Sequence, residues 1–265
     1  MAAGRVRVGV GGWTYDPWRE TFYPKEVKKA SELNYASRQL TAIEINGTFY
    51  RLQSASTFAK WRDATPEGFV FSVKAHRLTT YRKELAAGGD SVNRFLTSGL
   101  MELGDKLGPV LWQIEPRHAF EPDDLSRFLD LLPPEMNGRR LQHVLEVRHP
   151  TFACEQFIDM ARKKGVSMVF ADTDEYPSFA DVSGEVVYAR LMRAESEIPT
   201  GYQPEAIETW AARGKVWAEG GEPEGLPRLA GPAPKKPRDV FLFFISGAKE
   251  RNPAAAKALI AQIQA

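Results

Sequence analysis

The stretches VLWQI at Val110–Ile114 and HVLEVR at His143–Arg148 are short runs of apolar and β-branched residues. Between them, within Asp123–Leu132, an apolar stripe with helical spacing is formed by Leu125, Phe128, Leu129 and Leu132. A strand, a helix and a second strand in this order predict two parallel strands joined by a right-handed crossover. This unit decides the fold, because the same alternation recurs through the rest of the chain.

Eight runs of this kind are expected to be strands: Arg5–Val10, Ala42–Asn46, Phe69–Lys74, Val110–Ile114, His143–Arg148, Ser167–Asp172, Val186–Leu191 and Val240–Ser246. Helical patterns follow most of them, within Lys25–Leu40, Ser91–Leu107, Asp123–Leu132, Gln156–Lys164 and two segments that begin at Pro204 and at Asn252-Pro253, with Asn252 as the cap. Thr173–Gly184, after the sixth run, is short and poorly helical.

Eight such units in a chain of 265 residues predict an α/β fold, a single (β/α)₈ TIM-type barrel with a closed parallel sheet. An open doubly wound sheet is the rival architecture. It is disfavoured because Gly9-Val10-Gly11-Gly12-Trp13 lacks the glycine spacing of a dinucleotide site. We expect one domain over residues 1–265, with a long Gly/Pro-rich surface loop at residues 219–239.

The overall composition excludes several classes of partner and site. A formal net charge of +1, from 35 basic and 34 acidic residues, argues against a nucleic-acid or anionic-membrane partner. The single cysteine, Cys154, excludes an internal disulfide and a thiolate metal cluster. No signal sequence or membrane-spanning apolar run is evident, so a soluble, cytoplasmic protein is expected. The oligomeric state stays open.

Polar side chains gather where the predicted strands end, which is where barrels of this fold carry their functional residues. Because side chains alternate between the two faces of a strand, Glu44 points the same way as Asn46, and Glu146 the same way as Arg148. The candidate ligand-binding residues are Trp13, Tyr15, Asn46, Tyr50, Gln113, Arg148, His149, Asp172, Arg190 and Ser246.

The candidate catalytic residues are Lys74, Glu146 and Glu44. Desolvation and a nearby arginine lower the pKa of a lysine and make it a base or a Schiff-base nucleophile. The two carboxylates act in the opposite direction, which favours an electrostatic role for Lys74 and proton transfer by Glu146, with Arg148 holding the substrate's charge. The alternative is a structural ion-pair network of Glu44, Lys74, Glu146 and Arg190.

Other residues near the strand ends also allow two interpretations. The aromatic residues after the first two strands are Trp13, Tyr15, Trp18, Phe49 and Tyr50. They either stack on a planar or sugar ligand or pack the loops over the barrel mouth. His149 either binds ligand or begins its loop as a helix cap, and His118 and His143 are expected at the surface or in loops.

Neither a cofactor nor a transition-metal site is expected, because histidines are scarce and no His-x-x-x-His pair exists. A magnesium or manganese site built from Glu44, Glu146 and Asp172 remains an alternative. An anion site is a further hypothesis at the ends of the last two strands, where Arg190, Arg193, Ser246-Gly247 and the helix start at Asn252-Pro253 meet.

Five local sequences can be compared with a known family: Gly11-Gly12-Trp13-Thr14-Tyr15 with Trp18 and Phe22-Tyr23-Pro24; Glu44–Leu52; Phe71–Ala75; Lys106–Gln113; and Glu146-Val147-Arg148-His149-Pro150. Together they resemble the YecE-like family, called domain of unknown function 72, from about Val6 to the C-terminus. The resemblance implies a TIM-type barrel and supplies no reaction. The family's Phe-Asn-Asn-Asp at the end of the last strand here reads Phe244-Ile245-Ser246-Gly247, which implies a different ligand or lost activity.

The sequence favours an enzyme that acts on a small polar or anionic metabolite at the C-terminal mouth of the barrel. A non-catalytic ligand- or nucleic-acid-binding barrel and a metal-dependent phosphoesterase are the alternatives. Turnover in a metabolite screen, salt-sensitive oligonucleotide binding or a bound metal would favour the first, the second or the third, respectively.

Overall fold

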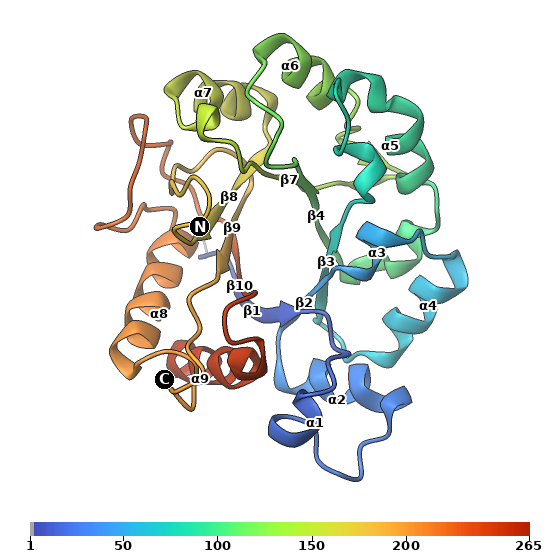
Figure 1. Ribbon diagram of the computed structural model, residues 1–265, viewed down its shortest axis with the longest axis vertical. Coiled ribbons are helices and arrows are strands. Elements are labelled where there is room, and N and C mark those ends of the chain that lie inside the picture. The colour runs from blue at the N-terminus through green and yellow to red at the C-terminus, as the bar shows by residue number, and fades with distance from the viewer. Residues whose placement is uncertain (1–2) are drawn as a thin grey trace.

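The computed structural model describes residues 3–265 and shows a ring of parallel strands surrounded by helices (Figure 1). Within these residues the barrel strands are β1 (Val6–Gly11), β2 (Ala42–Ile45), β3 (Val70–Lys74), β4 (Leu107–Gln113), β7 (His143–Glu146), β8 (Ser167–Asp172), β9 (Val186–Leu191) and β10 (Asp239–Phe244). Their order around the ring is β1-β10-β9-β8-β7-β4-β3-β2. The first strand pairs in parallel with both β2 and β10, so the predicted closed barrel is confirmed.

The observed strand bounds differ from the predicted ones most at β4. This strand begins at Leu107 rather than at Val110, and the register between β3 and β4 shifts between Phe71 and Val73. The irregular pairing accommodates Gly108-Pro109, which reads as a turn in the sequence, because a proline cannot donate to a regular ladder. A short antiparallel hairpin, β5 (Glu135–Met136) with β6 (Arg139–Arg140), precedes β7.

The helices around the barrel are α1 (Trp18–Thr21), α2 (Glu32–Gln39), α3 (Gly47–Tyr50), α4 (Ala55–Ala64), α5 (Gly89–Leu96), α6 (Pro122–Asp130), α7 (Glu155–Lys164), α8 (Pro204–Ala218) and α9 (Asn252–Gln264). Short 3₁₀ helices cover Lys29–Ser31, Arg77–Thr79, Leu85–Gly88, Leu100–Lys106, Pro150–Phe152 and Lys249–Arg251. None of the helices within residues 3–265 combines the length and apolarity needed to cross a bilayer.

Three helix predictions need correction. The first predicted helix is α-helical only from Glu32, after a 3₁₀ turn. The second divides after α5, because Gly99 adopts a φ of 116° before the next 3₁₀ segment begins. Asn252 is not the cap of α9: Arg251 occupies the cap position, and the Asn252 side chain instead donates to the carbonyl oxygen of Ser246.

The segment between β8 and β9 contains no helix within the described residues, and the loop at 219–239 lies beside it (Figure 1). The amide of Ala180 donates to the carbonyl of Pro227, and both carboxylate oxygens of Asp181 accept from the amides of Leu229 and Ala230. Leu226 and other apolar residues of the loop also pack on the core. The loop therefore takes the place of the missing helix.

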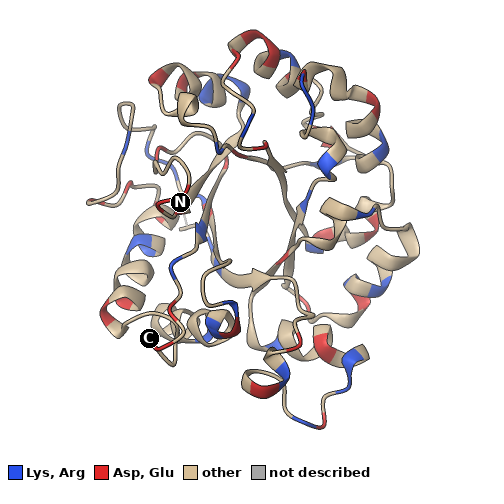
Figure 2. Cartoon of the chain, viewed as in Figure 1, with Lys and Arg blue, Asp and Glu red and all other residues tan. Residues whose placement is uncertain are grey.

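Apolar side chains form two layers, one inside the barrel and one between the barrel and its helices. The inner layer consists of Ala42, Val70, Leu111, Val144, Val169, Val186, Tyr188, Phe241, Phe243 and Ile245. Gly9 makes room for these rings, since a Cβ there would lie 1.9 Å from the carbonyl oxygen of Ala42 and 3.3 Å from the Phe243 ring. Charged residues lie mainly on the outer helices and loops, and the ring of strands is mostly uncharged (Figure 2).

Candidate functional site

A cavity of about 480 Å³ opens at the C-terminal ends of the barrel strands, where enzymes of this fold carry out their chemistry. It is lined by Gly11, Asn46, Phe49, Tyr50, Lys74, Tyr81, Gln113, Arg148, Arg190, Phe244, Ile245, Ser246, Lys249 and Asn252. We call it the mouth cavity. Among the described residues its lining holds four basic side chains and no Asp or Glu, so it suits an anionic ligand.

An arginine bridges two carboxylates beneath the mouth cavity. The guanidinium of Arg190 donates to both oxygens of Glu146, at 3.1 and 2.9 Å, and to Oε1 of Glu44 at 3.0 Å. All three side chains are at most 4% exposed. Burial by itself lowers the pKa of Arg190, but the two carboxylates outweigh it and raise this pKa above its ordinary value. Arg190 therefore stays protonated, and the bridge is a fixed ion-pair network.

Neighbouring side chains satisfy the remaining hydrogen-bonding capacity of the two carboxylates. Glu44 accepts from Asn46 Nδ2 at 2.9 Å and from Tyr188 Oη at 2.7 Å. Glu146 accepts from Gln113 Nε2 at 2.8 Å and from Arg148 Nε at 2.9 Å. The period-two prediction therefore gives the right geometry, since these side chains project inward and the residues between them pack outward.

Glu146 is a poor proton acceptor in this setting. Its complete burial raises its pKa, but Arg190, Arg148 and Lys74 act against burial and bring the pKa down to about 2. The expectation that Glu146 transfers protons therefore conflicts with its surroundings, because a carboxylate this acidic stays ionised at neutral pH.

Lys74 stands outside the ion-pair network, contrary to the Glu44–Lys74–Glu146–Arg190 alternative. Within residues 3–265 its Nζ has no carboxylate oxygen within 4.0 Å and no hydrogen bond; it lies 4.2 Å from the ring centre of Phe49. The residue is 8% exposed and lines the mouth cavity. Burial and then Arg190 lower the pKa of Lys74 to about 8, against the smaller opposing effects of Glu146 and Glu44. Desolvation thus outweighs the carboxylates, the reverse of the sequence-based expectation.

Two residues of the lining carry buried polar atoms without a partner in the described chain. Nε of Arg190 is an unused donor, and Oδ1 of Asn252 is an unused acceptor. Arg190 and Asn252 are 3% and 2% exposed. Unsatisfied buried polar groups cost about 1–3 kcal/mol each, so they are uncommon without a functional reason. A donor and an acceptor left free beside one cavity are a feature of ligand sites.

The sequence analysis missed the second lysine of the mouth cavity, Lys249. It lies on the 3₁₀ helix that follows β10, with its Nζ 4.3 Å from the ring centre of Tyr15. Burial lowers its pKa from the ordinary value. Its position in the loop after the last strand was the available signal. Tyr81 and Ile245 were likewise not assigned to the site, whereas Phe49 was named only within the aromatic cluster.

Several predicted ligand-binding residues lie outside the mouth cavity. Trp13 packs edge-on against Trp61 at 5.1 Å, and Tyr15 supports Lys249 rather than facing the cavity. His149 accepts from the amide of Thr151 and caps the 3₁₀ helix at Pro150–Phe152. The packing and capping interpretations therefore describe these three residues, because local partners already hold their side chains.

The predicted metal site, and the part of Arg193 in the predicted anion site, also conflict with the ion pairs. Asp172 accepts from Arg193 at 2.9 Å, and Arg193 binds Asp174 with two further bonds of 2.6 Å. Arg193 and Asp172 therefore neutralise each other away from the mouth cavity. With Glu44 and Glu146 held by arginine, no cluster of three or more His, Cys, Asp or Glu in residues 3–265 is placed to hold a metal ion.

Of the two histidines expected at the surface or in loops, His118 lies in a loop but is buried, and His143 is buried in a strand. His143 begins β7, where its Nδ1 accepts from Trp112 Nε1 at 3.0 Å and its Nε2 lies 2.8 Å from the Pro133 carbonyl. His118 is 9% exposed and lies 3.7 Å from Asp124. Each imidazole lies beside specific polar partners, and the spacing of residues in the sequence does not reveal such contacts.

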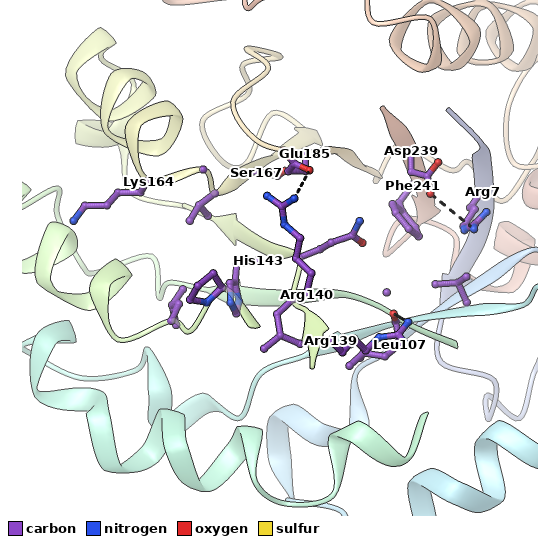
Figure 3. A pocket seen from close by; sticks show the side chains of 18 of the residues that line it. Arg7, Leu107, Arg139, Arg140, His143, Lys164, Ser167, Glu185, Asp239 and Phe241 are labelled. Atoms are coloured by element: carbon purple, nitrogen blue, oxygen red, sulfur yellow. Dashed lines mark hydrogen bonds and ion pairs between the residues drawn. The ribbon is translucent and has the colours of Figure 1, made fainter. Parts of the chain in front are cut away.

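A second cavity, of about 460 Å³, lies at the opposite end of the barrel, among the first residues of the strands (Figure 3). Each of its three arginines has a carboxylate partner: Arg7 with Asp239 at 3.9 Å, Arg139 with Asp105 at 2.9 Å and Arg140 with Glu185 at 3.6 Å. This end of a TIM barrel ordinarily serves stability. The second cavity also has one buried donor without a partner, Nε of Arg7, but the mouth cavity holds two lysines without an ion pair in the described residues and is the stronger candidate.

A family model matches nearly the whole barrel, and a curated relative matches part of it. The family model described as "Protein of unknown function DUF72" matches residues 7–265. The chain is 27% identical over 176 residues to the UPF0759 protein YecE of Escherichia coli (strain K12), a match that covers 63% of this chain and 59% of YecE.

Two crystal structures of DUF72 family proteins share the fold. The protein from Thermotoga maritima MSB8 is 19% identical, with a TM-score of 0.71 and 98% of each chain covered. The protein from Enterococcus faecalis V583 is 16% identical, with a TM-score of 0.72 and 98% of this chain and 96% of that chain covered. At these identities the likeness shows the fold alone.

Proposed function

The chain belongs to the DUF72 family of proteins of unknown function, and from this premise we propose that it is an enzyme acting on a small anionic metabolite in the mouth cavity. Lys74 is its acid–base group, and Arg148 and Lys249 hold the negative charge of the substrate. We also propose that residues 1–265 act as one domain, because segments from Val6 to Phe244 contribute strands to the same ring.

The observation that carries the proposal is the unpaired ammonium group of Lys74 in a lining without carboxylates. Burying a charge without a partner costs several kcal/mol, so such a group is retained where it has a role other than stability. A pKa of about 8 also brings Lys74 close to the operating pH of a general acid or base.

The basic groups of the mouth cavity differ in whether they are already paired. Arg190 and Arg148 are paired with carboxylates, whereas Lys74 and Lys249 have no ion pair within the described residues. Arg190 is bound to Glu44 and Glu146, and its Nε is left without a hydrogen-bond partner in the described chain. Arg148 neutralises part of Glu146 and extends to the cavity, with its guanidinium 4.2 Å from the ring centre of Tyr176. The planar guanidinium donors suit a carboxylate or phosphate group.

The observed ion pairs disfavour the other two candidate functions. A metal-dependent phosphoesterase needs carboxylates that are free to bind the metal, and here arginines hold Glu44, Glu146 and Asp172. A nucleic-acid-binding barrel needs an extended basic surface. The basic groups of the mouth instead surround a concave, half-open space of about 480 Å³, which suits a small molecule.

Anion binding by matched variants tests the proposal. Calorimetric titration with oxalate and inorganic phosphate at low ionic strength should show binding by the wild type. Arg148→Met should weaken it about tenfold or more, because a charge-assisted hydrogen bond contributes about 1.5–3 kcal/mol. Arg213→Met is the control, since Arg213 also lies over an aromatic ring, Trp210 at 4.6 Å, but outside the mouth cavity. No binding of either anion at millimolar concentration, or equal losses in both variants, would contradict the proposal.

A further inference from the structure

We propose that Lys74 is a covalent nucleophile, whose Nζ forms an imine with the carbonyl carbon of a small 2-oxo acid held in the mouth cavity. The inference rests on the proposed function and deepens it, because it names the substrate class and makes Lys74 the nucleophile that forms a bond rather than the acid–base group. An acid–base or purely electrostatic lysine would bind the same anions without becoming attached to them.

The position of Lys74 fits a nucleophilic amine. It is the last residue of β3, so its attachment point is held by the sheet and its aliphatic stem is buried. The Nζ lies over the face of Phe49, and no hydrogen bond within residues 3–265 occupies it. A lysine paired with a carboxylate would have to break that pair before its nitrogen could attack.

Four charged groups from three strands of the barrel face Lys74. They are Arg190 on β9, Arg148 after β7, Glu146 on β7 and Glu44 on β2. The two carboxylates are bound to Arg190, and Arg148 compensates Glu146 further, so little negative charge remains to hold the ammonium form.

The resulting protonation equilibrium makes the amine available near neutral pH. With a pKa of about 8, about a quarter of Lys74 is uncharged at pH 7.5, whereas about 0.1% of a lysine with the ordinary pKa of 10.5 is uncharged. The ratio is about 240-fold. Lowered pKa through desolvation and a neighbouring cation is the general means by which proteins activate Schiff-base lysines.

The lining selects a carbonyl compound that carries an adjacent carboxylate. Arg148, Arg190 and Lys249 line the same space as Lys74 and supply positive charge around it. The buried Oδ1 of Asn252 can accept from a hydroxyl group of the ligand or of the first addition product. A carboxylate bound to the cations leaves its neighbouring carbonyl within the same cavity as Nζ.

Tyr81 supplies the proton transfer that imine formation needs. Its hydroxyl donates to Gln113 Oε1 at 3.3 Å. Its ring lies 5.2 Å from the ring of Phe49, and the Nζ of Lys74 lies over that same Phe49 ring. Burial raises the pKa of Tyr81, so the phenol keeps its proton until a stronger base takes it.

The covalent step balances without a further reactant. Neutral Nζ attacks the carbonyl carbon; the C–N bond forms, the C=O π bond opens, and the nitrogen's proton passes to the oxygen through Tyr81. The hydroxyl of this carbinolamine then takes one more proton, which solvent supplies through Tyr81. The C–O bond breaks, water leaves, and the iminium keeps the positive charge.

Borohydride trapping tests the inference directly. The full chain is incubated at pH 7.5 with glyoxylate or with pyruvate, and sodium borohydride then donates hydride to any iminium and makes the attachment permanent. Intact mass and peptide mapping locate the modification. We expect Lys74 to be modified at least tenfold more than any other lysine with at least one of the two acids, and the modification to be absent from Lys74→Arg.

Lys74→Arg keeps the charge and removes the reactive amine, and its melting curve shows whether it folds. The trapping result and the anion titration separate the two proposals. Binding of oxalate without modification of Lys74 by either acid overturns the imine and leaves the anion site standing. Absence of both binding and modification overturns both, and modification spread evenly over the lysines overturns the imine as well.

Discussion

Replacing Lys74 with methionine should make the protein more stable at neutral pH, although the residue is buried. Lys74 has no ion pair to lose, and its pKa in the folded state is lowered by burial and by Arg190 from 10.5 to about 8. A difference of this size corresponds to about 3 kcal/mol of destabilisation by the charged form. Methionine fills a similar volume without the charge. Losing the contact between the ammonium group and the face of Phe49 costs about 1 kcal/mol of this stabilisation. The net gain in the free energy of unfolding is therefore about 2 kcal/mol.

The gain should depend on pH in a defined direction. The unfolded chain keeps the proton of this lysine up to about pH 10.5, whereas the folded chain releases it above about pH 8. The wild type therefore gains stability from this group as the pH rises between those values. The advantage of Lys74→Met is complete below pH 8 and disappears towards pH 10.5.

Urea unfolding of both proteins at pH 7 and at pH 9.5 measures the effect, and the difference between them cancels changes common to both. We expect the methionine variant to be more stable at pH 7, with a smaller advantage at pH 9.5. A variant that is less stable than the wild type by more than about 1 kcal/mol at pH 7 would refute the reasoning, since a lost ion pair of that kind costs about 3–5 kcal/mol. An advantage that increases with pH would also refute it.

Three other substitutions test the network around the site. Arg190→Met should lower the free energy of unfolding by about 3–5 kcal/mol, because two buried carboxylates lose their cation; an unchanged urea midpoint would contradict the network. Tyr188→Phe removes a buried donor to Glu44 and should cost about 1–3 kcal/mol in the same assay, with no cost if that oxygen has another partner. Arg193→Ala should leave oxalate affinity unchanged in calorimetry, because its partners lie outside the mouth cavity; weaker binding would restore Arg193 to the site.

The sequence was sufficient for the barrel and for the inward direction of its polar residues. Alternating strands and helices predict the ring, and the period of two places Glu44 and Glu146 inside it. The ion pairs across the ring could not be predicted from the sequence. Whether Arg190 or Lys74 bridges the two carboxylates depends on distances between β2, β7 and β9. Only these distances show that Lys74 is unpaired.

Loops after the strands were predicted less well than the strands themselves. Asp172 ends its strand like the other candidates, yet Arg193 from the loop after β9 neutralises it. Lys249 lies beyond the strand end, and the turn at Ser246, with a φ of 60°, brings its segment back to the cavity. A strand period cannot describe such positions, because the backbone direction changes within the turn.

The pKa of Lys74, measured with and without a bound anion, tests the central claim most directly. Lysine labelled with ¹⁵N gives one Nζ resonance that is absent from Lys74→Arg, and its titration reports this one group. A pKa of about 8 that rises when oxalate binds is the predicted result, because an anion stabilises the ammonium form. A pKa at or above the ordinary 10.5, unchanged by oxalate, would show that Lys74 is neither desolvated nor part of an anion site.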